Sequence, residues 1–200
     1  MICLWSHLAL SQKTLEKQIP ASGIEGIFID TDLVFDIKIE TERTADDIKI
    51  HTEVEGETFD TLLIQTEIKN GILEIHTARS PSFKKIDDKL AAHKVLSIIL
   101  HLTIPENLNI EVASALASVT ASGNYNYVNF NLSSGNCFLK TFRGSGIVNT
   151  ERGNIIAHIF DQAIEASTRN GKLDIAETTT TTATLKLRSI DGDIKVIRSK

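Results

Sequence analysis

A chain of 200 residues, 42% of them hydrophobic, is long enough to bury one sizeable core without a metal or a disulfide to hold it together. Its net charge of −5 and the lack of a stripe of lysine and arginine argue against nucleic acid as a partner. Of the two cysteines, Cys3 falls in a segment expected to be removed, and Cys137 stands at an apolar position of a repeat. We therefore interpret Cys137 as a small core residue rather than a reactive thiol.

The chain begins with a short apolar segment typical of the end of a signal peptide. Residues 1–10 are polar only at Ser6 and His7, and the segment ends in Ala9-Leu10-Ser11, a small-x-small pattern that signal peptidase accepts. The basic region that normally opens a signal peptide is missing, so either the true start codon lies upstream or the leader is degenerate. We predict cleavage before Gln12 and an exported protein, in the periplasm, on the outer surface or secreted. A buried N-terminal strand is the alternative, and no later run is long and apolar enough for a transmembrane helix.

Alternating apolar and polar residues, the pattern of half-buried strands, fill most of residues 12–104. The first run predicts one strand, or two that break near residues 31–34, with one face made of Ile27, Ile29, Leu33, Phe35, Ile37 and Ile39. Similar runs cover residues 48–54 and 64–75, and the second is interrupted by Asn70-Gly71, which tolerates the positive φ of a tight turn. Residues 79–94 indicate a loop with one helical turn over residues 87–94. Strand character returns at residues 98–104 and stops at Pro105.

After Pro105 the chain repeats a short unit around a glycine. Gly135, Gly153, Gly171 and Gly192 follow one another at intervals of 18, 18 and 21 residues, and the longer interval contains the threonine run 178–182. Apolar residues stand two and four positions after each glycine and five before it: Cys137, Ile155, Leu173, Ile194; Leu139, Ala157, Ile175, Val196; Phe130, Val148, Ala166, Leu187. Gly123, followed by Tyr125 and Tyr127, matches the pattern but lies only 12 residues before Gly135, whereas a degenerate turn at Leu116-Ala117 gives a spacing of 19. Both registers stay open.

This repeat predicts an all-β fold of the β-solenoid class. One unit cannot bury its apolar face alone, but units stacked about 4.8 Å apart pair their backbones and share one core. In this interpretation Gly153 and Gly171 stack, and each glycine supplies a backbone conformation closed to other residues. The hydroxyl three residues earlier bonds its own turn, and the asparagines after the glycines form a ladder.

The predicted structural turn residues are therefore Gly71, Gly123, Gly135, Gly153, Gly171 and Gly192. We expect one continuous domain, with an N-terminal β region over residues 12–104 that caps a solenoid over residues 105–200. The alternative is an antiparallel β-sandwich or meander with a hairpin at each glycine.

The segment LTIPENLNIEV at residues 102–112, followed by T-x-x-G-N-type turns behind a secretory leader, resembles the putative adhesin family of bacterial β-strand-repeat domains. The resemblance covers roughly residues 20–200 and is clearest over residues 98–200. It implies a single-stranded right-handed β-helix in the bacterial envelope and surface adhesion without a defined ligand, and it offers no catalytic residues. The chain departs from the family in having no obvious repeat turn before Asn70-Gly71.

The sequence shows no pattern typical of a catalytic, cofactor or metal site. The six histidines lack metal-ligand spacing, and His101 is interpreted as an outward strand residue. Glu53, Glu55 and Glu57 indicate a solvated acidic strand face rather than a calcium site. Asp191 and Asp193 are expected to serve the turn at Gly192.

We therefore expect a non-enzymatic, adhesin-like interaction module whose partner is an envelope glycan or protein. A structural or assembly component of the envelope and a β-helix carbohydrate-active enzyme are the alternatives. The acidic N-terminal strands are expected to cap one end of the stack. At the other end, Ile194, Val196 and Ile197 are expected to form a C-terminal edge open to a partner or to a second copy of the chain.

Overall fold

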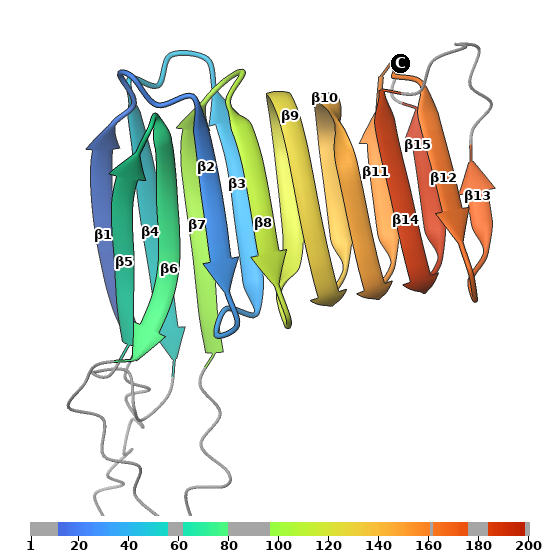
Figure 1. The fold of residues 1–200 in the computed structure, drawn as a ribbon, viewed down its shortest axis with the longest axis horizontal. Helices are drawn as coiled ribbons and strands as arrows, with labels where there is room; N and C mark the ends of the chain where they lie inside the picture. Colours follow the sequence, from blue (N-terminus) through green and yellow to red (C-terminus); the bar gives the residue numbers. More distant parts are fainter. Residues whose placement is uncertain (1–11, 56–61, 80–96, 161, 176–183, 199–200) are drawn as a thin grey trace, which may run out of the picture.

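A computed structural model describes residues 12–55, 62–79, 97–160, 162–175 and 184–198, which form strands and the turns that join them (Figure 1). The predicted signal peptide, Glu57, the expected helical turn at residues 87–94 and the threonine run 178–182 lie outside these residues. Within the described ranges, no helix is long and apolar enough to cross a membrane.

Fifteen strands follow one another along the described chain. The first eight are β1 Gln12–Pro20, β2 Gly26–Thr31, β3 Asp36–Glu42, β4 Asp47–Glu55, β5 Leu62–Lys69, β6 Ile72–Arg79, β7 Ser97–Pro105 and β8 Asn109–Ser114. The others are β9 Ser118–Ser134, β10 Cys137–Arg152, β11 Ile155–Ile159, β12 Ile164–Thr168, β13 Leu173–Ile175, β14 Leu185–Asp191 and β15 Ile194–Arg198. The prediction of an all-β chain is thus confirmed.

The N-terminal strands follow the predicted alternation closely. The first run is broken into β2 and β3 at the expected place, and its inward residues Ile27, Ile29, Ile37 and Ile39 are buried. The prediction that Phe35 belongs to this inward face is wrong. Phe35 lies in the connection between β2 and β3 and is 46% exposed. Asn70 and Gly71 join β5 to β6 in a tight antiparallel hairpin with φ of 51° and 78°.

The strands pair into one open sheet that runs as two layers, one behind the other in Figure 1. Layer 1 has the order β5-β6-β2-β8-β9-β10-β14-β12, and layer 2 the order β1-β4-β7-β3-β9-β10-β11-β15-β13. The long strands β9 and β10 contribute their first halves to layer 2 and their second halves to layer 1. Antiparallel pairs, of the kind the sandwich or meander alternative predicts, join β1 to β4, β4 to β7 and β5 to β6.

All described pairs among β8–β15 are parallel, and several keep a constant sequence offset. Cys137 lies between Val119 and Ile155, each 18 residues away along the chain. This register decides between the two turns left open by the sequence. Gly135 faces the Ala117 carbonyl, so the degenerate turn at Leu116-Ala117 is the equivalent of the later glycine turns, and Gly123 instead faces Thr41.

The last two repeats do not stack in the order of the sequence. β14 lies between β10 and β12, and β15 lies between β11 and β13. The prediction that Gly153 and Gly171 stack is therefore wrong, because Gly192 lies between them. The prediction that Ile194, Val196 and Ile197 form an open edge is wrong as well, because β15 pairs on both sides. β12 and β13 instead form the C-terminal end of the stack.

Inward side chains of both layers make one apolar core. Rows of Ile, Leu and Val from β2, β3, β7, β8, β10 and β15 are fully or almost fully buried, together with Phe130 and Phe142. Tyr125 stacks on Phe142, and its hydroxyl lies 2.8 Å from the Ile39 carbonyl and 3.0 Å from the Ser122 carbonyl, which share its single proton. Burial raises the pKa of Tyr125, so this hydroxyl stays protonated as a donor. At the N-terminal end, the edge strands β1 and β5 are bridged by a contact of Lys17 with Thr66.

Candidate binding face

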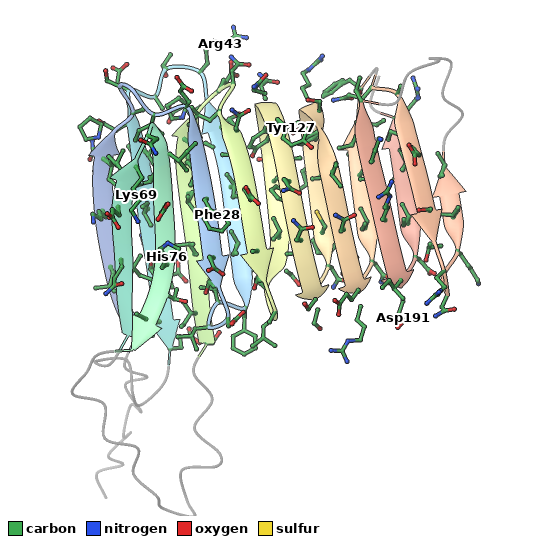
Figure 2. All side chains as sticks on the ribbon, in the orientation of Figure 1. Phe28, Arg43, Lys69, His76, Tyr127 and Asp191 are labelled. Atoms are coloured by element: carbon green, nitrogen blue, oxygen red, sulfur yellow. The ribbon has the colours of Figure 1, made fainter. Side chains whose placement is uncertain are left out.

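Layer 1 presents a regular outward surface rich in side-chain amides. Because residues alternate along a strand, the burial of Ile110, Val112, Val128, Phe130 and Val148 turns their neighbours outward. We name the resulting surface on β8, β9 and β10 the amide face, and it consists of Asn109, Glu111, Tyr127, Asn129, Asn131 and Asn149. Figure 2 labels Tyr127 of this face, which lies on β9.

Hydrogen bonds run across the amide face from strand to strand. Asn149 donates from Nδ2 to Oδ1 of Asn131 at 2.9 Å, and Asn131 donates in turn to Asn129 at 3.2 Å. Asn129 then donates to Oε1 of Glu111 at 3.2 Å, so the chain of amides ends on a carboxylate. A parallel bond joins Asn126 to Asn109 at 2.7 Å. These bonds fix the orientation of the amides and make the surface a preformed array of donors and acceptors.

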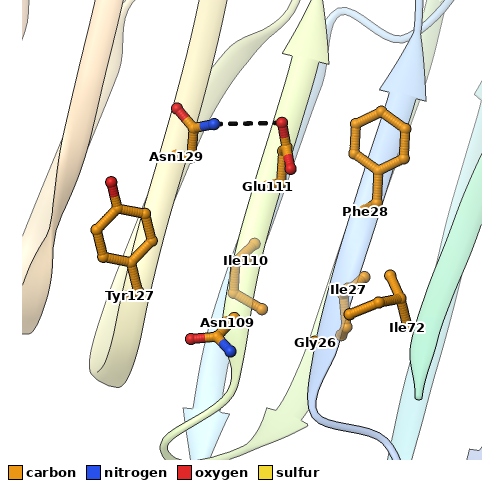
Figure 3. Close-up of a pocket in the computed structure, with 9 residues that line it drawn as sticks. All are labelled: Gly26, Ile27, Phe28, Ile72, Asn109, Ile110, Glu111, Tyr127 and Asn129. Carbon is orange, nitrogen blue, oxygen red and sulfur yellow. Dashed lines mark hydrogen bonds between the residues drawn. The ribbon is translucent and has the colours of Figure 1, made fainter. Parts of the chain in front are cut away.

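A shallow groove of about 190 Å³ opens where the amide face meets β2 and β6 (Figure 3). It is lined by Gly26, Ile27, Phe28, Ile72, Asn109, Ile110, Glu111, Tyr127 and Asn129. Gly26 occupies an outward position between Ile72 and Asn109 in the register of the sheet. A Cβ there would approach the Asn109 carbonyl oxygen to 3.0 Å and Ile72 Cδ1 to 3.1 Å. Glycine therefore lowers the floor of the groove.

Two aromatic rings stand on either side of the polar residues of this groove. In Figure 3, Tyr127 projects from β9 and Phe28 from β2, with Asn109 and Glu111 of β8 between them. Tyr127 is 39% exposed, which is unusual for a large ring in the middle of a sheet. The groove thus combines flat apolar surface with amide and carboxylate groups, a composition suited to a ligand that has both characters.

A second groove of about 260 Å³ continues the surface toward β14. It is lined by Asn131, Leu132, Ser133, Asn149, Thr150, Glu151 and Ile190. Asn131 and Asn149 belong to the amide face, and Ile190 is 44% exposed. The two grooves therefore lie along one surface that crosses several strands, as the binding surface for an extended partner requires.

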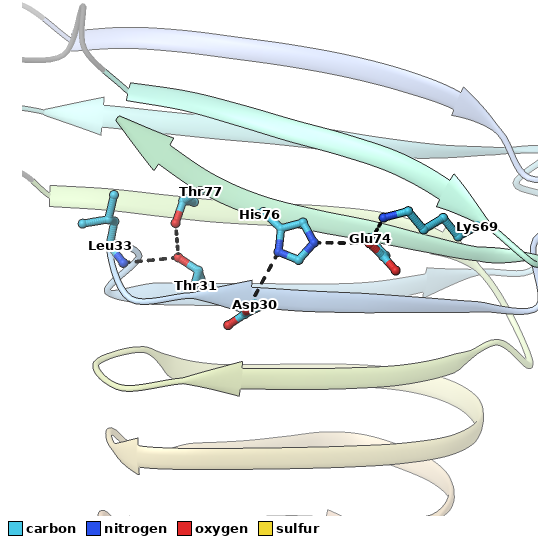
Figure 4. Close-up of polar contacts among 7 residues, drawn as sticks. All are labelled: Asp30, Thr31, Leu33, Lys69, Glu74, His76 and Thr77. Carbon is cyan, nitrogen blue, oxygen red and sulfur yellow. Dashed lines mark hydrogen bonds and ion pairs between the residues drawn. The ribbon is translucent and has the colours of Figure 1, made fainter. Parts of the chain in front are cut away.

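A network of charged side chains on β2, β5 and β6 lies beside the amide face (Figure 4). His76 lies 3.8 Å from Asp30 through Nδ1 and 3.5 Å from Glu74 through Nε2. Lys69 contacts Glu67 at 2.9 Å and Glu74 at 3.1 Å. The hydrogen bond from Lys69, followed by that from His76, lowers the pKa of Glu74, and the bonds to Glu67 and Glu74 raise the pKa of Lys69.

The carboxylates of Asp30, Glu67 and Glu74 thus each lie within 4 Å of a lysine or histidine side chain. Within the described ranges, no group of three or more His, Cys, Asp and Glu side chains is arranged to hold a metal ion.

The histidine, glutamate, cysteine and aspartates that were considered as site residues in the sequence lie away from the amide face. His101 points outward from β7, with Nε2 3.7 Å from Glu40, and Glu53 contacts His51 at 3.2 Å. Cys137 is fully buried, and burial raises the pKa of its thiol, so its interpretation as a core residue is confirmed. Asp193 accepts a hydrogen bond from the backbone of Lys172, and Asp191 from the side chain of Asn170. Both aspartates thus serve the neighbouring turn rather than their own.

The predicted turn glycines lie outside the amide face. Gly123 lies within β9, and the others lie between strands: Gly71, Gly135, Gly153, Gly171 and Gly192. Gly135, Gly153, Gly192 and Gly171 follow one another in space, and a Cβ on any of them would overlap the backbone carbonyl of the preceding turn. The prediction that each turn glycine supplies a backbone conformation closed to other residues is wrong for Gly153, Gly171 and Gly192, which do not have positive φ. Close packing of successive turns, and not an unusual backbone conformation, excludes a side chain at these three positions.

The polar residues of these turns also differ from expectation. Thr150, Ser189 and Thr168 donate to the carbonyls of Gly135, Gly153 and Gly192, which belong to the neighbouring turn. In the described part of the chain, only Ser114 and Thr31 bond their own turns, accepting from backbone amides two or three residues on. The hydroxyls therefore help to join one repeat to the next.

The groove was not predicted from the sequence, although the choice between the two repeat registers already bore on the direction of Tyr127. If Gly123 were a repeat turn, Tyr127 would take an inward position, whereas the register set by Leu116-Ala117 turns it outward. Gly26 could not be predicted as part of a groove, because the other strands that line the groove are more than 40 residues away in the sequence.

Comparisons with known proteins place the fold among a group of solved structures. No family model matches the sequence, and no curated protein matches it. A putative cell adhesion protein from Clostridium sporogenes has a TM-score of 0.59 at 15% identity, over 94% of this chain and 100% of that chain. This likeness shows a shared fold.

Two further solved structures are less similar. A putative adhesin from Bacteroides fragilis gives a TM-score of 0.42 at 14% identity, over 94% of this chain and 98% of that chain. A putative adhesin from Parabacteroides distasonis gives 0.32 at 15% identity, over 92% and 97%.

Proposed function

We propose that this protein is a non-enzymatic, adhesin-like interaction module of the bacterial cell envelope, which binds an envelope glycan or protein through its amide face. The observation that carries the proposal is the hydrogen-bonded row of amides on β8, β9 and β10, bordered by two grooves on a rigid sheet. Such a surface fits an extended partner better than a small molecule, because its polar groups are spread over several strands.

The same proposal includes export and a β-solenoid fold, a right-handed β-helix in which β9, β10 and the later strands form successive turns. Support comes from the parallel pairs, from the 18-residue offset that places Cys137 between Val119 and Ile155, and from the fold shared with the Clostridium sporogenes protein. The chain crosses from one layer to the other within β9 and again within β10, as it does in a solenoid.

The absence of turnover is also part of the proposal. Glycoside hydrolysis typically needs two carboxyl groups about 5–10 Å apart across the scissile bond. Each of the two grooves is lined by a single carboxylate, Glu111 in one and Glu151 in the other. Glu111 already accepts a hydrogen bond from Asn129, which favours a role in orienting amides.

An assembly component of the envelope is the second candidate function. It is favoured by the C-terminal end of the stack, where Leu173 and Ile175 are 48% and 37% exposed. Their register partners Ile194 and Val196 in β15 are buried. Apolar core positions therefore become solvent-exposed on the last strand, and such an edge favours pairing with another copy.

The test of the proposed function combines retention with turnover. We expect the full chain to be retained on envelope fractions of its host and to release no product from a panel of polysaccharides. A chain that is not retained would contradict the interaction role. Saturable turnover of a glycan, abolished by substitution of one Asp or Glu, would overturn the proposal in favour of an enzyme.

A further inference from the structure

Resting on the proposed function, we infer that the groove floored by Gly26 is a subsite for one neutral pyranose unit of a glycan, held against Tyr127. A pyranose has an apolar face made of C–H groups and an equatorial rim of hydroxyls. It therefore needs a flat apolar surface beside polar groups that can both donate and accept hydrogen bonds.

The groove supplies the apolar surface from two directions. Tyr127 exposes 39% of its surface beside the floor, and Ile72 and Phe28 line the other side. Gly26 keeps the floor open, since its nearest neighbours would be crowded by a Cβ. A volume of about 190 Å³ accommodates a single sugar ring rather than a drug-sized ligand.

The polar groups of the groove are oriented and only partly used. Oδ1 of Asn109 accepts from Asn126, which leaves the Nδ2 group of Asn109 as a donor. Oε1 of Glu111 accepts from Asn129, so its second oxygen is available as an acceptor. Donor and acceptor thus stand side by side on β8, at positions separated by one residue, and a pair of neighbouring sugar hydroxyls can bind both.

Charge decides the class of sugar. None of the nine residues that line the groove is a lysine or an arginine, and Glu111 contributes a negative charge. On the adjoining strands Glu74 contacts Lys69 at 3.1 Å and Asp30 lies 3.8 Å from His76, so Glu111 provides the charge within the groove. A uronic acid or a phosphorylated sugar would be repelled, whereas a neutral hexose or N-acetylhexosamine meets no such penalty.

Titration calorimetry with the full chain tests this inference. The probes are neutral oligosaccharides of glucose, galactose, mannose and N-acetylglucosamine, and oligogalacturonate serves as the acidic probe. We expect a neutral oligosaccharide to bind, Tyr127→Ala to weaken its affinity about tenfold or more, and Tyr127→Phe to retain most of it. Phe35→Ala, which removes a ring of similar exposure outside the groove, is the matched control and should leave binding unchanged.

The outcomes separate this inference from the proposed function. Circular dichroism of each variant shows whether a loss of binding reflects unfolding, and Glu111→Gln supplies a second, smaller change in the same groove. If no neutral oligosaccharide binds, or if oligogalacturonate binds better, the inference is overturned even when the chain is still retained on envelope fractions. If that retention depends on envelope protein and is abolished by protease, the partner is a protein. Loss of retention altogether would overturn the proposed function as well.

Discussion

Side-chain oxygens form a ladder along one row of turns, and this ladder shows how single residues join the repeats. Ser118 accepts a hydrogen bond from the backbone amide of Asn136, and Asn136 accepts one from that of Asn154. Asn154 in turn accepts from Asp193, and Asp193 from Lys172. The sequence predicted a ladder of asparagine side chains at these positions, but each side-chain oxygen accepts from a backbone N–H group rather than from another side-chain amide. The ladder therefore tolerates Ser, Asn or Asp, since each carries an acceptor oxygen.

Substitution of Asn154 tests the ladder. Asn154→Ala removes the acceptor for the Asp193 amide, and we expect it to lower the free energy of unfolding by about 1 kcal/mol. Asn154→Ser should lose less, because Ser118 accepts an equivalent bond elsewhere in the row. Denaturant melts of the two variants measure the difference. Equal stability of both variants and the parent chain would show that the ladder contributes nothing.

The packed glycines make a second prediction at this scale. Gly192→Ala places a methyl group against the carbonyl of Gly153, and we expect a loss of about 1–3 kcal/mol from overpacking. Gly23→Ala is the matched control: its φ of 80° strains the backbone, but its Cβ would meet open space, so about 1 kcal/mol is expected. Thermal unfolding compares the two. A Gly192→Ala chain as stable as the parent chain would show that the turns are not in contact.

At the scale of elements, the sequence predicted side-chain direction better than strand order. The alternation of apolar and polar residues correctly predicted that Ile155, Ile194 and Val196 point inward, because burial along a strand has a period of two. It could not predict that β14 and β15 insert between earlier strands. The unit at residues 164–175 and the unit at residues 185–196 carry the same pattern, so either order keeps the core intact. The antiparallel hairpin of β5 and β6 was predicted because Asn70-Gly71 is a local signal.

Engineered disulfides test the strand order directly. Ile156 lies opposite Lys195, whereas stacking in sequence order would place it opposite Asp174. In a chain with Cys3→Ser, the pair Ile156→Cys with Lys195→Cys should oxidise, since neighbouring strands lie about 4.8 Å apart. The pair Ile156→Cys with Asp174→Cys should not, because β15 separates them. Mass spectrometry after mild oxidation distinguishes the two, and a reversed result would contradict the observed order.

At the scale of the whole molecule, the two ends of the stack differ and the broad surface between them is regular. Lys17 and Thr66 connect the edge strands of the N-terminal end, while Leu173 and Ile175 leave the C-terminal end apolar. Strand composition could predict the existence of an open edge but not its identity, which depends on the inserted β14 and β15. The amide face could not be predicted from the sequence either, because it combines outward residues of strands that only the register of the sheet brings together.

The exposed edge leads to a prediction about self-association. We expect the chain to associate as its concentration rises, through β12 and β13, because strands that are paired on one side and carry exposed apolar side chains favour further pairing. Leu173→Lys should weaken this association, and Leu116→Lys, at a residue of similar exposure outside this edge, should not. Sedimentation velocity measures both variants. A parent chain that remains monomeric at all concentrations would contradict an edge-to-edge contact.

The most direct test of the amide face as the binding surface is a nuclear magnetic resonance titration of the isotope-labelled chain with solubilised glycan and protein from its host envelope. The account predicts that chemical-shift changes concentrate on the backbone amides of Gly26, Tyr127 and Asn129, while Ile156 and Lys195, on the outward side of layer 2, stay unchanged. Changes confined to layer 2 or to the β12–β13 end, or no changes at all, would contradict it.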